Sequence, residues 1–469
     1  MGLRRIFILV AILAIGIFVW QLPTLLKAIP SRYVAAYLPQ SIQSLAVREH
    51  VETLPTAAVV MDTSKLLLPE ASPHVEIPTV ETAGFTNENF TSDSNNIPNA
   101  TPQGEAINSS TTPGADSEQD DNNPIEAPQP TTLPSPTPTD TPVPVPAEGR
   151  LGSIRHHFQI WNNCGPATLA MGLSYFDVLL TQEQTASSLK PNPEDRNVSP
   201  DEMAAFVNQE TDLLAFDRTN GNLHTLKRLI TEGIPVIIEL GIDPPGEYRW
   251  MGWYGHYLLV VAYDEASQKF WVYDSWFGTS EVPGENADAE GREIPYADLD
   301  RYWRQFNRDY IVLYQPDQKS TVNEIVGPDM DDMVMWQRSL ERVKDELQTS
   351  PDDAFLWFNL GTVYNALGDH EKAALAFDQA RSIGLPWRML WYQFGPYEAY
   401  YEEGRYQDVI LLAEVTLKDR PYFEESYYYK GLAEAALGNE KQAREDLEKA
   451  ARFNPNFALA VSAVEQLDT

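Results

Sequence analysis

A single cysteine, Cys164, occurs in the 469 residues of this chain. A chain with one cysteine cannot form an intrachain disulfide, so its domains must be stable through core packing alone, even if they are exported. Basic residues are also scarce, since 34 Lys and Arg stand against 68 Asp and Glu, which gives a net charge of −34. This balance argues against nucleic acid and anionic membrane surfaces as partners of the soluble part.

The sequence also lacks the motifs that usually hold cofactors. It has no glycine-rich phosphate loop, no His-Glu-x-x-His motif and no cysteine cluster. Histidines number seven, and the adjacent pair His156 and His157 would need further metal ligands that the sequence does not offer. We therefore expect neither a metal nor a cofactor.

One long apolar run is present, and it lies near the N-terminus. Arg4 and Arg5 precede a largely apolar stretch from Ile6 to Leu26. A basic flank followed by about 20 such residues is the pattern of a signal peptide or a signal anchor. Because no small-x-small cleavage site follows, we expect an uncleaved transmembrane helix within residues 1–30, which crosses the cell membrane once and leaves the domains on the extracytoplasmic side. If the N-terminal segment is cleaved, the protein is secreted. The alternative interpretation of the apolar run is a buried helix of a soluble domain.

Residues 31–150 have the composition of a stalk. After a mixed stretch, Pro, Thr, Ser, Asn, Asp and Glu predominate from Pro73 to Gly149, and residues 134–146 alternate Pro mainly with Thr, Ser and Val. Such a composition cannot bury enough apolar surface to offset chain ordering, so we expect a mostly disordered linker with polyproline character. About 100 flexible residues would hold a domain on the order of 50 Å from its anchor.

Cys164 opens a sequence that is typical of a helix N-terminus. It is followed by Gly165 and Pro166 and then by residues 167–173, a run of mainly Ala, Leu and Met that we expect to be helical. Proline suits the first turn of a helix because its missing N–H would have no partner there. The partial positive charge at that end favours thiolate over thiol. Cys164 can therefore act as a nucleophile if a histidine and an orienting group reach it.

Candidates for those two groups lie on a predicted β-hairpin. Residues 254–264 and 270–276 have the aromatic and β-branched composition of strands, and the residues between them have that of a turn. His256 lies at the start of the first strand and Asp274 near the end of the second. Antiparallel pairing would bring both side chains to the same end of the hairpin. Asp264 offers a second carboxylate near this hairpin.

Four motifs in this order resemble those of the C39-like cysteine peptidases, which have a papain-like fold. They are a Gln, then Cys-Gly-Pro-Ala, Gly-His-Tyr and Val-Tyr-Asp-Ser-Trp, and the resemblance spans roughly residues 154–315. It implies that Cys164 is the nucleophile, His256 its base and Asp274 the group that orients the base. It also implies that Gln159 helps to form the oxyanion hole, while Asn162 and Asn163 likewise precede the cysteine.

The rest of residues 151–318 has helical patterns first and strands later. We expect helices at 181–189, 199–207 and 223–232 and a strand at 234–240. This order predicts an α+β peptidase domain with the nucleophile on a helix and the base on a sheet. The aromatic loop at 241–254 could line a substrate cleft or pack beneath the sheet.

An internal repeat begins after about Asp352. One copy runs from Trp357 to Pro386 and another from Tyr427 to Pro455, and a third copy with about two extra residues lies between them. The spacing of Gly, Ala and aromatic residues resembles the tetratricopeptide family, which implies an all-α solenoid at residues 331–469. In such arrays small residues let the paired helices approach each other closely.

The repeats carry more aromatic residues than their core requires. The surplus consists of Trp387, Trp391, Tyr392, Tyr397, Tyr400, Tyr401 and Tyr427–Tyr429. We expect some of them to line a groove that recruits substrate or a protein partner. The alternative is that the repeats dock against the catalytic domain.

These features together predict a membrane-anchored, extracytoplasmic cysteine peptidase that hydrolyses peptide or amide bonds and carries a partner-binding tetratricopeptide module. An acyl or peptidyl transferase would use the same thioester chemistry. The competing class is a non-catalytic receptor or scaffold that only binds peptide. The expected partners are a peptide or protein substrate, a protein bound by the repeats, and the membrane through the N-terminal helix, with no nucleic acid.

Overall fold

The computed structural model describes residues 21–22, 53–57, 63–67, 143–160, 162–195, 198–243, 252–277 and 290–467. The predicted transmembrane run and most of the predicted stalk lie outside these ranges. Among the described residues, no helix is long and apolar enough to cross a membrane. The N-terminal anchor and the disorder of the stalk therefore stay predictions.

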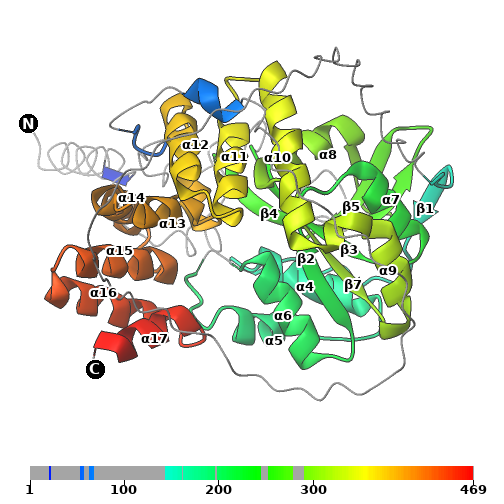
Figure 1. The fold of residues 1–469 in the computed structure, drawn as a ribbon. Coiled ribbons are helices and arrows are strands. Elements are labelled where there is room, and N and C mark those ends of the chain that lie inside the picture. Colours follow the sequence, from blue (N-terminus) through cyan, green and yellow to red (C-terminus); the bar gives the residue numbers. More distant parts are fainter. Residues whose placement is uncertain are drawn as a thin grey trace, which may run out of the picture. The chain divides into compact units, whose positions relative to one another are not determined.

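An antiparallel sheet lies at the centre of the first module (Figure 1). Strands β2, β7, β3, β4, β5 and β6 follow one another in this order across the sheet, and β1 pairs with β4. All of these pairings are antiparallel. The strands are β1 (Glu148–Arg150), β2 (Leu214–Arg218), β3 (Val236–Ile242), β4 (Tyr254–Asp264), β5 (Lys269–Asp274), β6 (Arg292–Pro295) and β7 (Tyr310–Tyr314).

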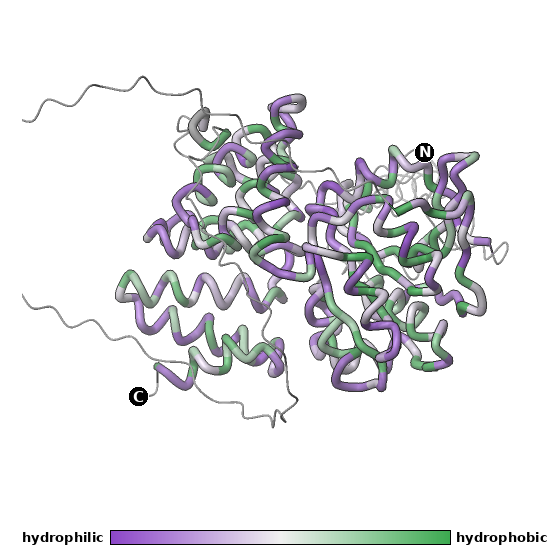
Figure 2. The backbone as a smooth tube through the Cα atoms, turned by 45° about the vertical axis from the view of Figure 1, so that its right-hand side comes forward, coloured by the Kyte–Doolittle hydropathy of each residue, from purple (hydrophilic) through white to green (hydrophobic). Residues whose placement is uncertain are grey.

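Helices cover both faces of this sheet, as the alternation along β3 shows. Val236 and Ile238 belong to one hydrophobic cluster with α7, α8 and α9, whereas Ile237 belongs to another with α4, α5 and α6. Figure 2 shows hydrophobic and hydrophilic positions alternating along the backbone of the helices. The helices are α4 (Cys164–Ser174), α5 (Gln182–Leu189), α6 (Pro200–Glu210), α7 (Leu223–Thr231), α8 (Tyr296–Trp303) and α9 (Lys319–Val326).

The helix caps follow from the sequence. Thr181 and Ser199 each form a capping box at the start of α5 and α6, and the Asn222 side chain accepts a hydrogen bond from the Thr225 backbone N–H at the start of α7. The predicted helices are therefore confirmed. The predicted hairpin is also confirmed, except that its second strand ends at Asp274 rather than at 276.

Pairs of helices form the C-terminal module. The predicted close approach of paired helices is confirmed at Gly361, where an added Cβ would lie 2.6 Å from the ring of Phe377. The elements are α10 (Asp332–Thr349), α11 (Ala354–Ala366), α12 (His370–Ile383), η7 (Trp387–Trp391), α13 (Gly395–Glu402), α14 (Tyr406–Asp419), α15 (Glu424–Ala436), α16 (Glu440–Phe453) and α17 (Ala458–Leu467).

The repeats pack against the first module through α11 and its neighbours. The Asn359 amide donates a hydrogen bond of 2.7 Å to the backbone carbonyl of Arg304, whose guanidinium pairs with Asp353 at 3.0 Å. Trp253, at the end of the predicted aromatic loop, stacks on Phe306 and contacts Phe355 of α11. Trp253 thus lies between the two modules, while residues 244–251 of that loop are outside the described ranges.

Part of the predicted aromatic groove is instead repeat core. Trp387, Trp391, Tyr397 and Tyr400 are buried, so the expectation that these side chains are surplus to the core is wrong. Helix η7 contains two of these tryptophans, which pack edge to face at 4.9 Å and cluster with Phe423. The alternative prediction is that the repeats dock against the catalytic domain. The structure contains such a contact next to these tryptophans, since Arg388 of η7 donates a hydrogen bond to the Trp253 carbonyl.

Two pieces of the predicted stalk also lie within the repeat module. Residues 53–57 and the short helix η2 (Thr63–Leu67) contribute Leu54 and Leu66 to the core of α11 and α12. We call residues 53–57 and 63–67 together the docked segment. The end of the predicted stalk, Glu148–Arg150, is strand β1 of the sheet.

Candidate active site

Cys164 is the first residue of helix α4, as the sequence predicts. Its side chain is half-buried, and the remaining residues of the helix are buried against the sheet. Burial by itself raises the pKa of the thiol, but the hydrogen bond to His256 and the positive charges of His256 and Lys190 lower it below its ordinary value. The helix start and these two cations therefore favour a thiolate.

His256 and Asp274 lie at the same end of the β4–β5 hairpin. His256 Nε2 is 2.8 Å from Asp274 Oδ1, and both side chains are buried. This contact leaves Nδ1 of the ring for Cys164. Burial alone would lower the pKa of His256, but the charge and hydrogen bond of Asp274, together with Cys164, raise it to about 9. A raised pKa favours the protonated imidazolium at neutral pH, and this cation can pair with a Cys164 thiolate.

Asp274 is held in place by several donors. Its Oδ1 also accepts hydrogen bonds from the backbone N–H groups of Trp276 and Phe277, and its Oδ2 pairs with Arg292 at 2.7 Å. Burial alone would raise the pKa of this carboxyl, but the charges of His256 and Arg292 hold the pKa well below its usual range. Asp274 thus stays ionised and can fix the orientation of His256.

Asp264, the other carboxylate of the hairpin, lies at the opposite end. It accepts hydrogen bonds from the backbone N–H groups of Ala266 and Ser267 in the turn. It pairs in register with Lys269, whereas Asp274 pairs with Leu258 near the start of β4. Asp264 is therefore a turn cap, and Asp274 is the carboxylate beside His256.

Gln159 is fastened to the residue that follows Asp274. Its backbone N–H donates to the Ser275 carbonyl, and its side-chain Oε1 accepts a hydrogen bond of 2.8 Å from Ser275 Oγ. Gln159 Oε1 accepts this hydrogen bond from Ser275, which fixes the orientation of the amide. The amide nitrogen is the hydrogen-bond donor of the side chain. A donor is what an oxyanion requires.

Gln182 holds the backbone on both sides of Gln159. Its Nε2 donates to the Phe158 carbonyl and its Oε1 accepts from the Ile160 N–H, each at 2.8 Å. The same oxygen accepts a hydrogen bond from the amide of Asn163, which is buried. Asn163 therefore anchors the start of α4, while Asn162 has a left-handed backbone with φ 55°.

Three supporting residues were not singled out by the sequence. Arg292 lies on the neighbouring strand β6, Gln182 starts helix α5, and Lys190 at the end of α5 donates to the carbonyl of Asn162. Their positions relative to Cys164 depend on the packing of elements that are distant along the chain. No local motif marks them, and a single sequence gives no signal that would have found them.

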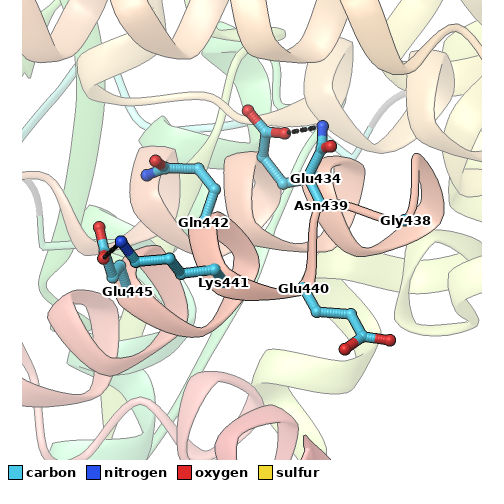
Figure 3. Close-up of a pocket in the computed structure, with 7 residues that line it drawn as sticks. All are labelled: Glu434, Gly438, Asn439, Glu440, Lys441, Gln442 and Glu445. Carbon is cyan, nitrogen blue, oxygen red and sulfur yellow. Dashed lines mark hydrogen bonds and ion pairs between the residues drawn. The ribbon is translucent and has the colours of Figure 1, made fainter.

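An open, charged pocket lies at the turn between α15 and α16 (Figure 3). It is lined by Glu434, Gly438, Asn439, Glu440, Lys441, Gln442 and Glu445. None of the four candidate catalytic residues is among them, and the Asn439 amide and the Lys441 ammonium are paired with Glu434 and Glu445. We therefore locate the candidate active site at Cys164 rather than in this pocket.

Parts of the chain match known protein families. Residues 152–310 match the model of the Peptidase_C39 like family, and residues 356–383 and 424–457 match that of the tetratricopeptide repeat. The chain is similar to a solved structure from Bacillus anthracis that is described as a C39-like peptidase, with 15% identity and a TM-score of 0.28 over 36% of this chain and 98% of that one. No curated protein matches the chain. The chain thus contains a region that is similar to the C39-like peptidase family, followed by regions that are similar to tetratricopeptide repeats.

Proposed function

We propose that the chain is a cysteine peptidase of papain-like fold that hydrolyses peptide bonds through Cys164, His256 and Asp274. The observation that supports this proposal most is the arrangement of the buried His256–Asp274 pair, which hydrogen-bonds a half-buried thiol at a helix N-terminus. This combination activates a thiol as a nucleophile, whereas a cysteine that serves only as a small apolar residue needs neither a base nor a carboxylate.

In the proposed reaction the Cys164 thiolate attacks the carbonyl carbon of the substrate, and the carbonyl π electrons move to oxygen. The backbone N–H of Cys164 and the amide of Gln159 would donate hydrogen bonds to that oxyanion. His256 gives its proton to the departing nitrogen as the C–N bond breaks and a thioester forms. His256 then takes a proton from water, which attacks the thioester and releases the acid and the thiolate. Asp274 stabilises the imidazolium during both steps.

The test is proteolysis by the full chain, with Cys164→Ser as the matched variant. Wild type is expected to cleave peptides within a diverse synthetic library, and the products should carry new carboxylates and free amines. The variant is expected to leave the library intact. A wild-type protein that joins the acyl part to an added amine instead would be a transferase. A wild type and a variant that both bind peptide without any new product would be a receptor or scaffold.

We also propose that the catalytic domain is extracytoplasmic and anchored by residues 1–30. The support for this is the basic flank and the apolar run of the sequence. Protease added to intact cells should digest residues 143–469 if the proposal is right, and should reach them only after lysis if it is wrong.

The tetratricopeptide repeats suggest protein–protein interaction, and we propose that they recruit a protein substrate. Recruitment predicts that a protein substrate has a lower KM than a short peptide that spans its cleaved bond. Equal KM values would leave the repeats with an intramolecular role only.

A further inference from the structure

The docked segment is bound by the repeats much as a peptide ligand would be. Leu54 and Leu66 are 2% and 3% exposed and belong to the same hydrophobic cluster as Leu360 and Phe377 of α11 and α12. Ala57 is buried as well, whereas Thr56 between these positions is exposed. Burial of large apolar side chains is the main source of affinity in such contacts.

Hydrogen bonds fix the backbone of the docked segment on the same surface. The Leu54 N–H donates to the Leu385 carbonyl at 2.9 Å, and Thr53 forms a β-bridge with Pro386. The Arg381 guanidinium donates to the carbonyl of Pro55 at 2.8 Å. At the other end, the Tyr364 hydroxyl donates to the Leu66 carbonyl at 3.0 Å, and this contact is buried. Both pieces of the segment are thus held by side chains and by backbone.

The docked segment and strand β1 lie on either side of one long stretch of the chain. The compact unit that contains the repeats extends to Leu68 and resumes at Pro144, just before strand β1. The stretch from Pro69 to Val143 therefore starts and ends on one unit. While the docked segment stays bound to the repeats, the length of this stretch does not determine the distance between the catalytic domain and the N-terminal run.

We propose that the docked segment is a non-covalent tether that keeps the first 67 residues attached to the tetratricopeptide repeats when the chain is cut between Pro69 and Val143. The partner of this repeat surface is the chain's own segment, with its two buried leucines. Exposed segments with small and polar residues are the preferred places for proteolytic nicking, and Ser, Thr, Asn and Asp are common between Pro73 and Gly149. Such a cut would shed the catalytic domain of a simply tethered enzyme but not of this one. The proposal does not depend on peptidase activity.

The test uses the full chain in mild detergent, with Cys164→Ala to prevent self-cleavage. A recognition sequence for a site-specific endopeptidase is inserted near Gly114, and the protein is cut to completion. We expect the two fragments to co-elute on size exclusion. In the variant Leu54→Asp/Leu66→Asp, cutting should separate them, because two carboxylates would replace buried leucines and weaken the association roughly 100-fold or more.

Two further variants make the outcome specific. Thr56→Asp adds a charge at an exposed position of the same segment and should leave the fragments together. Tyr364→Phe removes the hydroxyl that donates to the Leu66 carbonyl from the repeat side and should weaken the association about 3- to 10-fold. Separation of the unmodified fragments, or continued association in the double leucine variant, would overturn the proposal.

Discussion

At the scale of single residues, the site is organised around Asp274. One of its oxygens faces His256 and two backbone N–H groups, and the other faces Arg292. The carboxylate therefore links the base on β4 to the neighbouring strand β6. This position accounts for both the orientation of the imidazole and its raised pKa.

Asp274→Asn should reduce kcat for peptide cleavage by roughly 100-fold or more, because the base loses its ionic partner and its preferred tautomer. The measurement is steady-state cleavage of a peptide found in the library screen. Asp264→Asn is the matched control on the same hairpin, and it should change kcat by no more than about twofold. Equal losses in the two variants would mean that the hairpin is only being destabilised.

Gln159 differs from Asp274 because its proposed role begins only after the thiolate attacks. Gln159→Ala should therefore lower kcat roughly 100- to 1,000-fold while the rate of Cys164 alkylation by iodoacetamide stays unchanged, since alkylation forms no oxyanion. Asn162→Gly removes the other amide that precedes the cysteine, keeps the left-handed backbone of this position accessible, and should retain activity. A loss of alkylation in Gln159→Ala would show instead that this residue supports the thiolate or the fold.

At the scale of elements, local chemistry decides where helices begin and how closely they pair. Gly361 illustrates the second point, because its missing Cβ leaves room for the Phe377 ring at 2.6 Å from the ideal Cβ position. Phe377 and Gly361 belong to different helices of one repeat. The repeat spacing in the sequence predicts this pairing correctly.

Gly361→Val should destabilise the protein by about 1–3 kcal/mol, because the added side chain overlaps the Phe377 ring. Thermal unfolding followed by circular dichroism measures the effect. Gly368→Asn is a suitable control, since Gly368 ends α11 with φ 78°, has open space beside it and can be replaced by a residue that tolerates this backbone. Unchanged stability in Gly361→Val would show that the helix pair can separate at little cost.

The sequence predicts elements well where the signal is local. Ser199 with Glu202, and Asn222, mark helix starts that the structure contains, and the residues around 265–268 form the predicted turn. The partners that hold Asp274 and Gln159 were not predictable. Arg292 and Gln182 reach the site from elements that are distant along the chain, so their roles depend on tertiary packing rather than on local pattern.

The burial of the docked segment was even less predictable from local sequence patterns. Leu54 and Leu66 lie in a weakly apolar stretch next to a Pro-rich one, and composition alone assigns them to the stalk. Their burial depends on a surface made far later in the chain, as the contact between Leu66 and Tyr364 shows with its sequence separation of 298. A contact between residues so far apart along the chain cannot be predicted from hydrophobic periodicity or from turn residues.

At the scale of the whole molecule, the described parts of the peptidase domain and the repeats form a single unit. Arg388 donates to the carbonyl of Trp253, the residue directly before strand β4, on which His256 lies. The packing of the repeats thus reaches strand β4, which carries the proposed catalytic base. The proposed chemistry requires that His256 activates Cys164 by favouring its thiolate.

Alkylation of Cys164 by iodoacetamide across roughly pH 4 to 9 tests this activation most directly, and a chain with one cysteine gives a single signal. The thiolate of the ion pair forms once the pH exceeds the lowered pKa of Cys164, and His256 remains charged until about pH 9. We therefore predict rapid labelling well below the free-thiol pKa of about 8.5, and its loss in His256→Ala. Slow labelling that rises only near that pKa, and equally in both proteins, would contradict the proposed activation of Cys164.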